Sequence, residues 1–171
     1  FASGKIRANN IIVEDTTLTV SYAAGESVNL EAIASDGWRF SHWELEKNIL
    51  SPNLNNLNVG YVVEHTDNIK ANFKEIFEVY VPNSFTPSNF DNLHNNFEVS
   101  VYSVQGVKYK LEIFNRFGET IFQSNDLNKS WDGSYNNGNQ VPSGVYLYLL
   151  KVESNMTGNK IEKKGSITLL R

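Results

Sequence analysis

Two stretches near the end of the chain decide the fold: Val145–Val152, which reads VYLYLLKV, and Ser166–Leu170, which reads SITLL. Both are rich in β-branched and aromatic residues, which favour extended strands because their side chains pack well on a pleated sheet. Between them, Asn155–Asn159 (NMTGN) contains Gly and Asn, the residues that most easily adopt the positive φ of a tight reversal. The sequence therefore predicts a β-hairpin over this region.

The same extended pattern recurs along the whole chain. Short β-branched or alternating runs, separated by Gly, Asn and Pro, occupy residues 11–13, 17–22, 27–33, 97–102 and 110–114. Helical periodicity is confined to Ser41–Leu50, where one or two turns could form before Pro52 stops them. Short strands at regular intervals predict an all-β fold, either an antiparallel sandwich or a barrel.

The composition is that of a folded protein without disulfides. Of 171 residues, 40% are hydrophobic and 20% are charged, which is enough to supply a core. The absence of cysteine removes disulfides, thiolate zinc sites and cysteine nucleophiles, and it fits a cytosolic protein or a bacterial surface protein. The sequence has no run of about 20 apolar residues and no signal peptide, so we expect no direct membrane insertion, and either a cytosolic protein or a fragment of a longer one.

The net charge of −4 is unevenly distributed. Residues 1–78 carry 6 basic and 11 acidic side chains, whereas residues 79–171 carry 9 basic and 8 acidic ones. The lysines of the second part are interspersed with acids and do not form a basic stripe. Because such a stripe drives binding to phosphate backbones, we expect no nucleic-acid partner.

A domain boundary is predicted between Phe73 and Val81. The segment Lys74–Glu78 (KEIFE) is charged and lacks a Gly or Pro cluster, which is typical of a short, stiff joint. We place a first domain at residues 1–78 and a second domain at residues 79–171.

No motif points to catalysis, a metal or a cofactor. The sequence lacks a Gly-x-Ser-x-Gly turn, a phosphate-binding glycine loop and a credible pair of acids, so we expect a protein that is not an enzyme. The three histidines lack metal-ligand spacing. One loop could offer oxygens to Ca²⁺, but only one of its four candidates is charged and no central glycine is present, so no metal is predicted. These candidates are Asn89, Asp91, Asn92 and Asn95.

Three segments of the first domain carry a family pattern: Gly25–Ala32 (GESVNLEA), Asp36–Trp43 (DGWRFSHW) and Asp67–Phe73 (DNIKANF). Together they resemble the divergent B-repeat of internalin-type surface proteins. The resemblance implies a small β-grasp-like or all-β repeat module, of the kind that forms stalks in adhesins. In this pattern Gly37 reverses the chain while Phe40 and Trp43 pack on the sheet.

Five blocks of the second domain carry a second pattern. They are Val81–Pro87 (VPNSFTP), Ile113–Phe122 (IFNRFGETIF), Trp131–Gly133 (WDG), Val141–Tyr148 (VPSGVYLY) and Gly165–Arg171 (GSITLLR). In this order they resemble the gliding-motility-associated C-terminal domain, which is the type B sorting domain of the Bacteroidetes type IX secretion system. Relatives have a glycine-rich turn after the Phe-Thr-Pro block, whereas residues 88–95 (SNFDNLHN) contain no glycine, so this loop must adopt another backbone conformation.

The second resemblance implies an immunoglobulin-like β-sandwich that is exported through the periplasm and directs an attached protein across the outer membrane to the cell surface. It implies large adhesins of gliding motility as cargo. It also implies two partners, the type IX translocon and a porin-like outer-membrane protein. No cofactor is implied.

The blocks can also be interpreted from elementary chemistry. Asn115–Gly118 lies between two apolar strands and is typical of a hairpin turn, where Arg116 reaches solvent, pairs with a carboxylate or belongs to a docking surface. Trp131 is expected to bury its indole while Asp132 caps the turn, and Pro142 sets the entry to a strand. The resemblance assigns partner binding to Phe85, Thr86, Pro87, Asn115, Arg116, Gly118, Trp131, Asp132, Gly133, Pro142, Gly144, Tyr146 and Arg171.

The sequence therefore predicts a C-terminal secretion signal that works by protein–protein recognition, with exposed strand edges or turns presented to the export machinery. The alternative is a carbohydrate- or surface-binding adhesin module, in which exposed Trp or Tyr rings stack on sugars. Because this alternative needs aromatic rings in the open, burial of Trp38, Trp43 and Trp131 would count against it.

Overall fold

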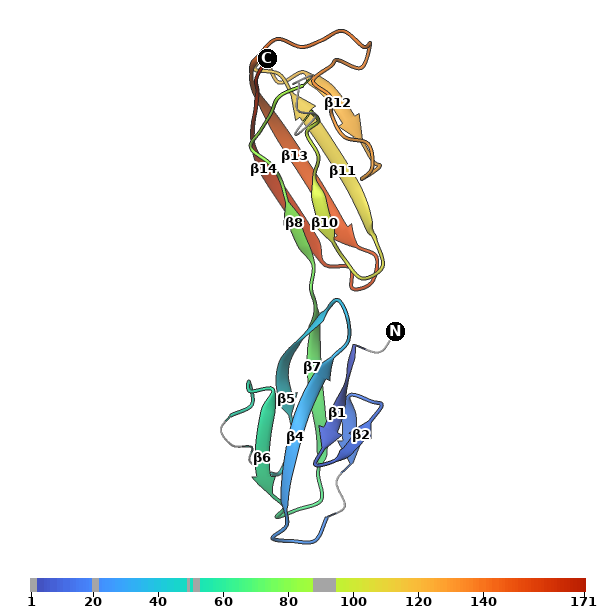
Figure 1. Cartoon of the computed structure of the whole chain (residues 1–171), viewed down its shortest axis with the longest axis vertical. Helices are drawn as coiled ribbons and strands as arrows, with labels where there is room; N and C mark the ends of the chain where they lie inside the picture. Colours follow the sequence, from blue (N-terminus) through green and yellow to red (C-terminus); the bar gives the residue numbers. More distant parts are fainter. Residues whose placement is uncertain (1–2, 20–21, 49, 51–52, 88–94) are drawn as a thin grey trace. The chain divides into compact units, whose positions relative to one another are not determined.

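The chain folds into two compact units, Phe1–Ile76 and Phe77–Arg171. A computed structural model describes residues 3–19, 22–48, 50, 53–87 and 95–171 (Figure 1). The described residues form strands and loops without a helix, so the predicted all-β class is confirmed. None of the described segments could cross a bilayer as a helix.

The first unit is built from two antiparallel sheets. One sheet has the order β2-β1-β4-β6 and the other has the order β3-β7-β5. Their bounds are β1 Gly4–Ala8, β2 Ile11–Val13, β3 Thr17–Thr19, β4 Ser27–Ala34, β5 Trp38–Glu44, β6 Asn58–Val62 and β7 Asn68–Glu75. Val28 and Leu30 of β4 are buried while the alternating Asn29 is exposed, as expected for a strand with one face on a core.

The two strands that differ from expectation are β3 and β5. The predicted strand at residues 17–22 is described only as far as Thr19, because Val20 and Ser21 lie outside the described residues. The helical turns that the sequence allowed within Ser41–Leu50 are not formed, since β5 runs as a strand to Glu44 and pairs with β7. Pairing with a neighbouring strand overrides the weak local helical pattern.

A β-bulge at Ser41 allows Phe40 and Trp43 to share one face of β5. Phe40 pairs with Phe73 and His42 pairs with Asn72, so Ser41 is the extra residue. Strand residues three apart normally point to opposite faces, and a bulge reverses this alternation. The rings of Phe40 and Trp43 consequently lie 5.5 Å apart, and Trp43 is fully buried.

Asp67 organises the loop that follows β5. Its buried carboxylate accepts hydrogen bonds from the backbone N–H groups of Glu46 (3.2 Å), Lys47 (2.8 Å), Asn48 (2.8 Å) and Asn68 (2.9 Å). Burial by itself would raise the pKa of Asp67, but these four backbone donors hold the pKa below its ordinary value. The loop is therefore fixed by a charged group.

Asn48 completes this arrangement from the other side. Its amide nitrogen donates to the carbonyl of His65 at 2.9 Å, and its amide oxygen accepts from the backbone N–H groups of Glu64 and His65. The buried Asn48 and Asp67 side chains thus tie two loops together. This structural role accounts for one of the asparagines that enrich the segment from residue 48 to residue 58.

The second unit is an immunoglobulin-like sandwich of a two-stranded sheet, β10-β8, and a five-stranded sheet, β12-β11-β13-β14-β9. The bounds are β8 Glu78–Tyr80, β9 Ser84–Phe85, β10 Ser100–Tyr102, β11 Val107–Phe114, β12 Thr120–Ser124, β13 Gly144–Ser154 and β14 Lys160–Leu169. The chain passes from the first sheet to the second between β8 and β9, where Pro82 lacks a donor that a partner strand would need.

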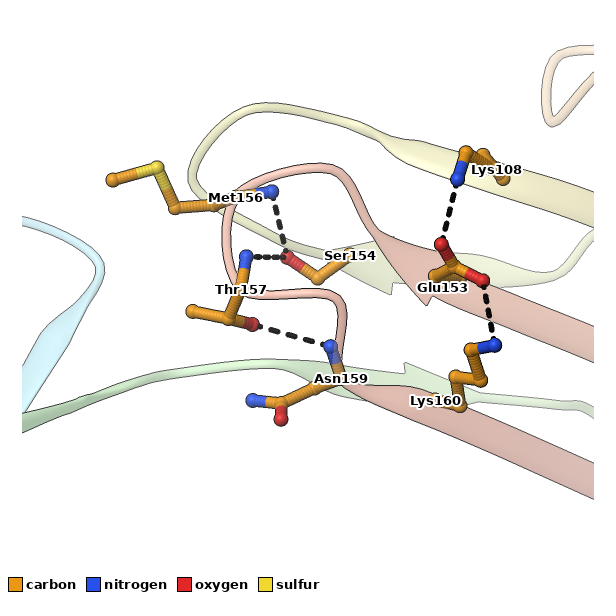
Figure 2. Close-up of polar contacts among 7 residues, drawn as sticks. All are labelled: Lys108, Glu153, Ser154, Met156, Thr157, Asn159 and Lys160. Carbon is orange, nitrogen blue, oxygen red and sulfur yellow. Dashed lines mark hydrogen bonds and ion pairs between the residues drawn. The ribbon is translucent and has the colours of Figure 1, made fainter.

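The predicted hairpin at the end of the chain is confirmed. β13 and β14 pair antiparallel from Gly144 opposite Leu169 to Glu153 opposite Lys160. In the turn, the hydroxyl oxygen of Ser154 accepts from the backbone N–H groups of Met156 (3.1 Å) and Thr157 (3.3 Å), as Figure 2 shows. The pairing register is therefore fixed at both ends of the hairpin.

Asp67→Asn should destabilise the first unit by about 1.5–3 kcal/mol at pH 7, because it weakens hydrogen bonds to a charged acceptor. Since the pKa of Asp67 is lower in the folded state, its stabilisation is present above the unfolded-state value of 3.8 and is lost as pH falls through the folded-state value. The variant should lack this acid-dependent loss. Thermal unfolding followed by circular dichroism at pH 7 and pH 3 measures both effects.

Glu46→Gln is the matched control. It removes a nearby exposed carboxylate but leaves the backbone N–H that Asp67 accepts. Its stability should stay within about 0.5 kcal/mol of the parent chain. Equal stability of the Asp67→Asn variant and the parent at pH 7 would contradict the role given to Asp67.

Candidate functional site

The predicted partner-binding residues converge on one end of the second unit. Gly144, which begins β13, pairs with Leu169, which ends β14, and Phe85 of β9 pairs with the same Leu169. Phe114, the last residue of β11, pairs with Leu147 of β13, so the turn after β11 lies at this end as well. We call this the motif end; it comprises residues 85–87, 115–119, 131–133, 141–146 and Arg171 (Figure 1).

Trp131 is the centre of the motif end. Its side chain is fully buried, and its indole N–H donates to the carbonyl of Ser134 at 2.8 Å. Its backbone forms an isolated antiparallel bridge with Phe97. The distance is 2.7 Å from the nitrogen of Phe97 to the oxygen of Trp131 and 3.1 Å from the nitrogen of Trp131 to the oxygen of Phe97. The centroid of its indole lies 5.2 Å from the ring centroid of Phe85 and 5.3 Å from that of Tyr146. One residue thereby joins four segments that are distant in the sequence.

Gly133 permits a close approach that no other residue would allow. Its φ of 80° lies in the left-handed region, and an added Cβ would lie 2.7 Å from Leu169 Cδ1 and 3.1 Å from Pro87 Cγ. The preceding Asp132 accepts the N–H of Ser134 at 2.9 Å through its carboxylate, which fixes the turn.

Arg171, which follows β14, binds the loop that contains Gly133. Its guanidinium donates to the carbonyl of Gly133 at 3.0 Å and to the carbonyl of Val141. A bidentate donor of this kind satisfies two backbone acceptors at once. The guanidinium therefore contributes to closing the sandwich.

Tyr146 holds the entry to β13. Its hydroxyl donates to the carbonyl of Pro142 at 2.7 Å, four residues upstream. Burial raises the pKa of Tyr146, the nearby Tyr135 adds to the rise, and Arg171 opposes it. The neutral hydroxyl thus remains a donor across the physiological pH range.

The turn between β11 and β12 is built around Asn115. Its side-chain oxygen accepts from the N–H groups of Phe117 (2.9 Å) and Glu119 (3.0 Å), and Gly118 has a φ of 82°. The turn presents Arg116 and Phe117 outward, with the guanidinium carbon of Arg116 4.8 Å from the centre of the Phe117 ring. Phe117 is 75% exposed, which is unusual for so large an apolar side chain.

The thirteen predicted residues differ in what they can offer to a partner. Several are buried or have their polar side-chain groups bonded within the domain: Phe85, Pro87, Asn115, Trp131, Gly133, Tyr146 and Arg171. Thr86 and Gly144 are half-buried. Four are exposed: Arg116, Gly118, Asp132 and Pro142, although the carboxylate of Asp132 is bonded to the N–H of Ser134. Phe117 was missed as a site residue because its apolar character in the sequence indicates a core position.

The described residues contain no group of three or more His, Asp or Glu side chains arranged to bind a metal. The candidate calcium ligands Asn89, Asp91 and Asn92 lie outside the described residues, as does His94, while Asn95 is half-buried. His42 lies beside Ser41, with 3.0 Å between its Nδ1 and the hydroxyl oxygen. The carbonyl of His65 is the acceptor used by Asn48.

Comparison with known families identifies both units. Residues 79–169 match the family model described as the CHU_C type IX secretion signal domain, and residues 12–77 match the model of the divergent InlB B-repeat domain. Both resemblances found in the sequence are therefore confirmed. No curated protein matches the chain.

Among solved structures, the chain is similar to PorZ, an essential bacterial surface component of the type-IX secretion system of Porphyromonas gingivalis. The match has 22% sequence identity and a TM-score of 0.33, and it covers 56% of this chain. The matched part spans 11% of the PorZ chain.

Two glycine substitutions should separate the energetic effect of the close approach at the motif end from that of left-handed backbone strain. Gly133→Ala should destabilise the second unit by about 2–5 kcal/mol, because left-handed strain of about 1–2 kcal/mol is added to overpacking of about 1–3 kcal/mol. Gly138→Ala is the matched control: its φ is 85° and nothing lies within 4 Å of the added Cβ. It should cost only the strain of about 1–2 kcal/mol.

Urea unfolding of the two variants and the parent chain measures the difference. Equal destabilisation by both substitutions would show that the close approach of Leu169 and Pro87 does not require a glycine at position 133.

Proposed function

This chain belongs to the CHU_C type IX secretion signal domain family, and from that premise we propose that its second unit directs a large gliding adhesin to the cell surface by protein–protein recognition. The observation that supports the proposal most is the match itself, which covers nearly the whole second unit. The signal is then a folded shape rather than a linear peptide, because its motif residues serve mainly to close the sandwich.

The proposed partners are the type IX translocon and a porin-like protein of the outer membrane. The route passes through the periplasm, and the exported protein stays attached at the outer surface. The absence of cysteine is compatible with this route, since the domain needs no disulfide formation to fold. The first unit serves as a stalk that separates the signal from the cargo, in keeping with its match to a repeat family.

We further propose that the chain has no catalytic activity. The two families that it matches are named for a secretion signal and a repeat, and neither name refers to a reaction. Recognition is thus the whole of the proposed mechanism.

The exposed turn between β11 and β12 is the proposed contact at the motif end. Arg116 offers a planar cation and Phe117 an open ring, and this combination of residues is enriched where partners bury a hot spot. The turn is held rigid by Asn115, so little conformational entropy would be lost on binding.

Carbohydrate binding is a second candidate. Trp43 and Trp131 are fully buried and cannot stack on a sugar, whereas Trp38 is half-buried. Tyr80 and Tyr102 are 68% and 53% exposed on the outer face of the two-stranded sheet. Tyr80 also lines a groove with Asn96 and Glu98, which offer polar groups to sugar hydroxyls. Glycan-array binding that disappears in a Tyr80→Ala variant would support this candidate, and absence of array binding by the parent chain would exclude it.

Export of a reporter tests the sorting role. A signal peptide and a reporter fused to the whole chain should appear at the surface of a type IX host, whereas a fusion ending at Ile76 should remain in the periplasm. Surface protease accessibility of the reporter measures both. Phe117→Ala in the whole-chain fusion should lower surface delivery at least several-fold, because it removes the open ring but no core contact.

Met156→Ala is the matched control, since Met156 is a large apolar residue in the turn at the opposite end of the same sandwich. It should be delivered like the parent. Periplasmic retention of the whole-chain fusion would refute the sorting role, and equal delivery of the Phe117→Ala and Met156→Ala fusions would refute the contact assigned to the turn.

A further inference from the structure

One side of β14 is largely without a partner strand. On its other side, β14 pairs with β13 along its full ten residues. On this side, β9 pairs only with Thr168 and Leu169. Within the described residues, no strand pairs with the part of β14 from Lys160 to Ser166 along this edge. We call this segment the open edge.

The direction of the backbone groups at the open edge follows from the hydrogen bonds that the next residues of the chain, Thr168 and Leu170, make. The N–H of Thr168 donates to the carbonyl of Asn83 at 2.8 Å, and the N–H of Leu170 donates to that of Phe85 at 3.1 Å. Successive strand residues alternate the edge toward which their backbone groups point. The even-numbered residues of the open edge therefore present their N–H and C=O groups outward; these are Lys160, Glu162, Lys164 and Ser166, and all are exposed.

The open edge is a product of the topology and not of fraying. The chain runs in the two-stranded sheet as β8 and crosses to the five-stranded sheet only after Tyr80, so β9 begins too late to cover more of β14. Meanwhile β13 holds Lys160–Ser166 in a regular strand. The edge is thus preorganised, which reduces the entropic cost of adding a strand.

The charge of the open edge is positive. Lys160, Lys163 and Lys164 outnumber the single Glu162, whose carboxylate lies 2.9 Å from the ammonium of Lys164 and 3.6 Å from that of Lys151. Lys160 shares Glu153 with Lys108, as Figure 2 shows, so one carboxylate serves two cations. The ammonium of Lys163 donates to the carbonyl of Val79 at 2.6 Å and has no carboxylate partner among the described residues. An incoming segment with acidic side chains would neutralise this surplus.

We propose that the open edge of β14 binds an extended acidic segment of a partner protein, which adds to the sheet as a sixth strand. This inference rests on the proposed sorting function, for which it supplies a binding mode. Backbone hydrogen bonds to Glu162, Lys164 and Ser166 give the affinity, and acidic side chains beside Lys160 and Lys164 give the preference. A second copy of this chain would bring the same positive surplus and is the less favourable occupant.

Hydrogen exchange of the full chain tests the inference with defined probes. Nine-residue peptides alternating Val with Glu, or Val with Lys, are added at millimolar concentration. The Val–Glu peptide should slow exchange of the amides of Glu162, Lys164 and Ser166 at least tenfold, while those of Lys163 and Gly165, which face β13, are protected with or without peptide. Unchanged exchange at the three outward amides would overturn the inference. Equal protection by the Val–Lys peptide would overturn the acidic preference.

Two variants separate backbone from side chain. Lys164→Pro removes an outward N–H that β13 does not use, so the fold should be retained while peptide affinity falls at least tenfold. Lys164→Ala keeps the N–H and should lose less than threefold. Similar affinity of Lys164→Pro and the parent would overturn the inference, as would protection that appears on concentrating the chain alone, which would identify a second copy as the occupant.

The reporter assay distinguishes this inference from the sorting function. Loss of export in the Lys164→Pro fusion, with export of the Lys164→Ala fusion, supports strand addition. Normal export of both fusions overturns strand addition while the sorting function stands. Failure of the parent fusion refutes the sorting function, and the peptide experiment then still decides whether the edge accepts an acidic strand.

Discussion

The burial of Trp131 is the interaction on which the second unit depends. The residue lies in the connection between β12 and β13, outside any strand, yet it pairs with Phe97 and packs against Phe85 and Tyr146. A buried side chain of this size contributes about 3–5 kcal/mol, a large share of the stability of a small domain. Without disulfides, this contact helps to close the end of the sandwich where Arg171 also binds the loop that contains Gly133.

This constraint explains why several of the motif residues are buried or bonded within the domain. Gly133 is needed because Leu169 approaches closely, and Arg171 is occupied by backbone carbonyls. Residues of this kind specify one fold, and under the proposed function the partner contacts what the fold leaves outside. Among the described residues, the turn with its exposed Phe117 ring and the positively charged edge of β14 are two features that the fold leaves outside.

The sequence predicted the strands whose causes are local, but it did not assign β1, β6, β7, β8 or β9. The alternation around Val145 and the turn at Gly158 identified the hairpin, and the burial of Trp131 followed from its chemistry. The Ser41 bulge, the Asp67 carboxylate with its four backbone donors, and the parallel pairing of β9 with β14 were not predictable in this way. Each depends on residues distant in the sequence, and neither composition nor periodicity records which backbone groups meet. The exposure of Phe117 was also not predicted, because it depends on which residues the folded domain places around that ring.

If the contacts around Trp131 close the sandwich, residues 77–171 should fold without the first unit. Chemical denaturation of that fragment alone, followed by circular dichroism and by the dispersion of its amide NMR signals, tests this most directly. We expect dispersed β-sheet signals and a single cooperative transition with the same midpoint as the second unit in the whole chain. Collapsed signals, or unfolding without a cooperative transition, would contradict it.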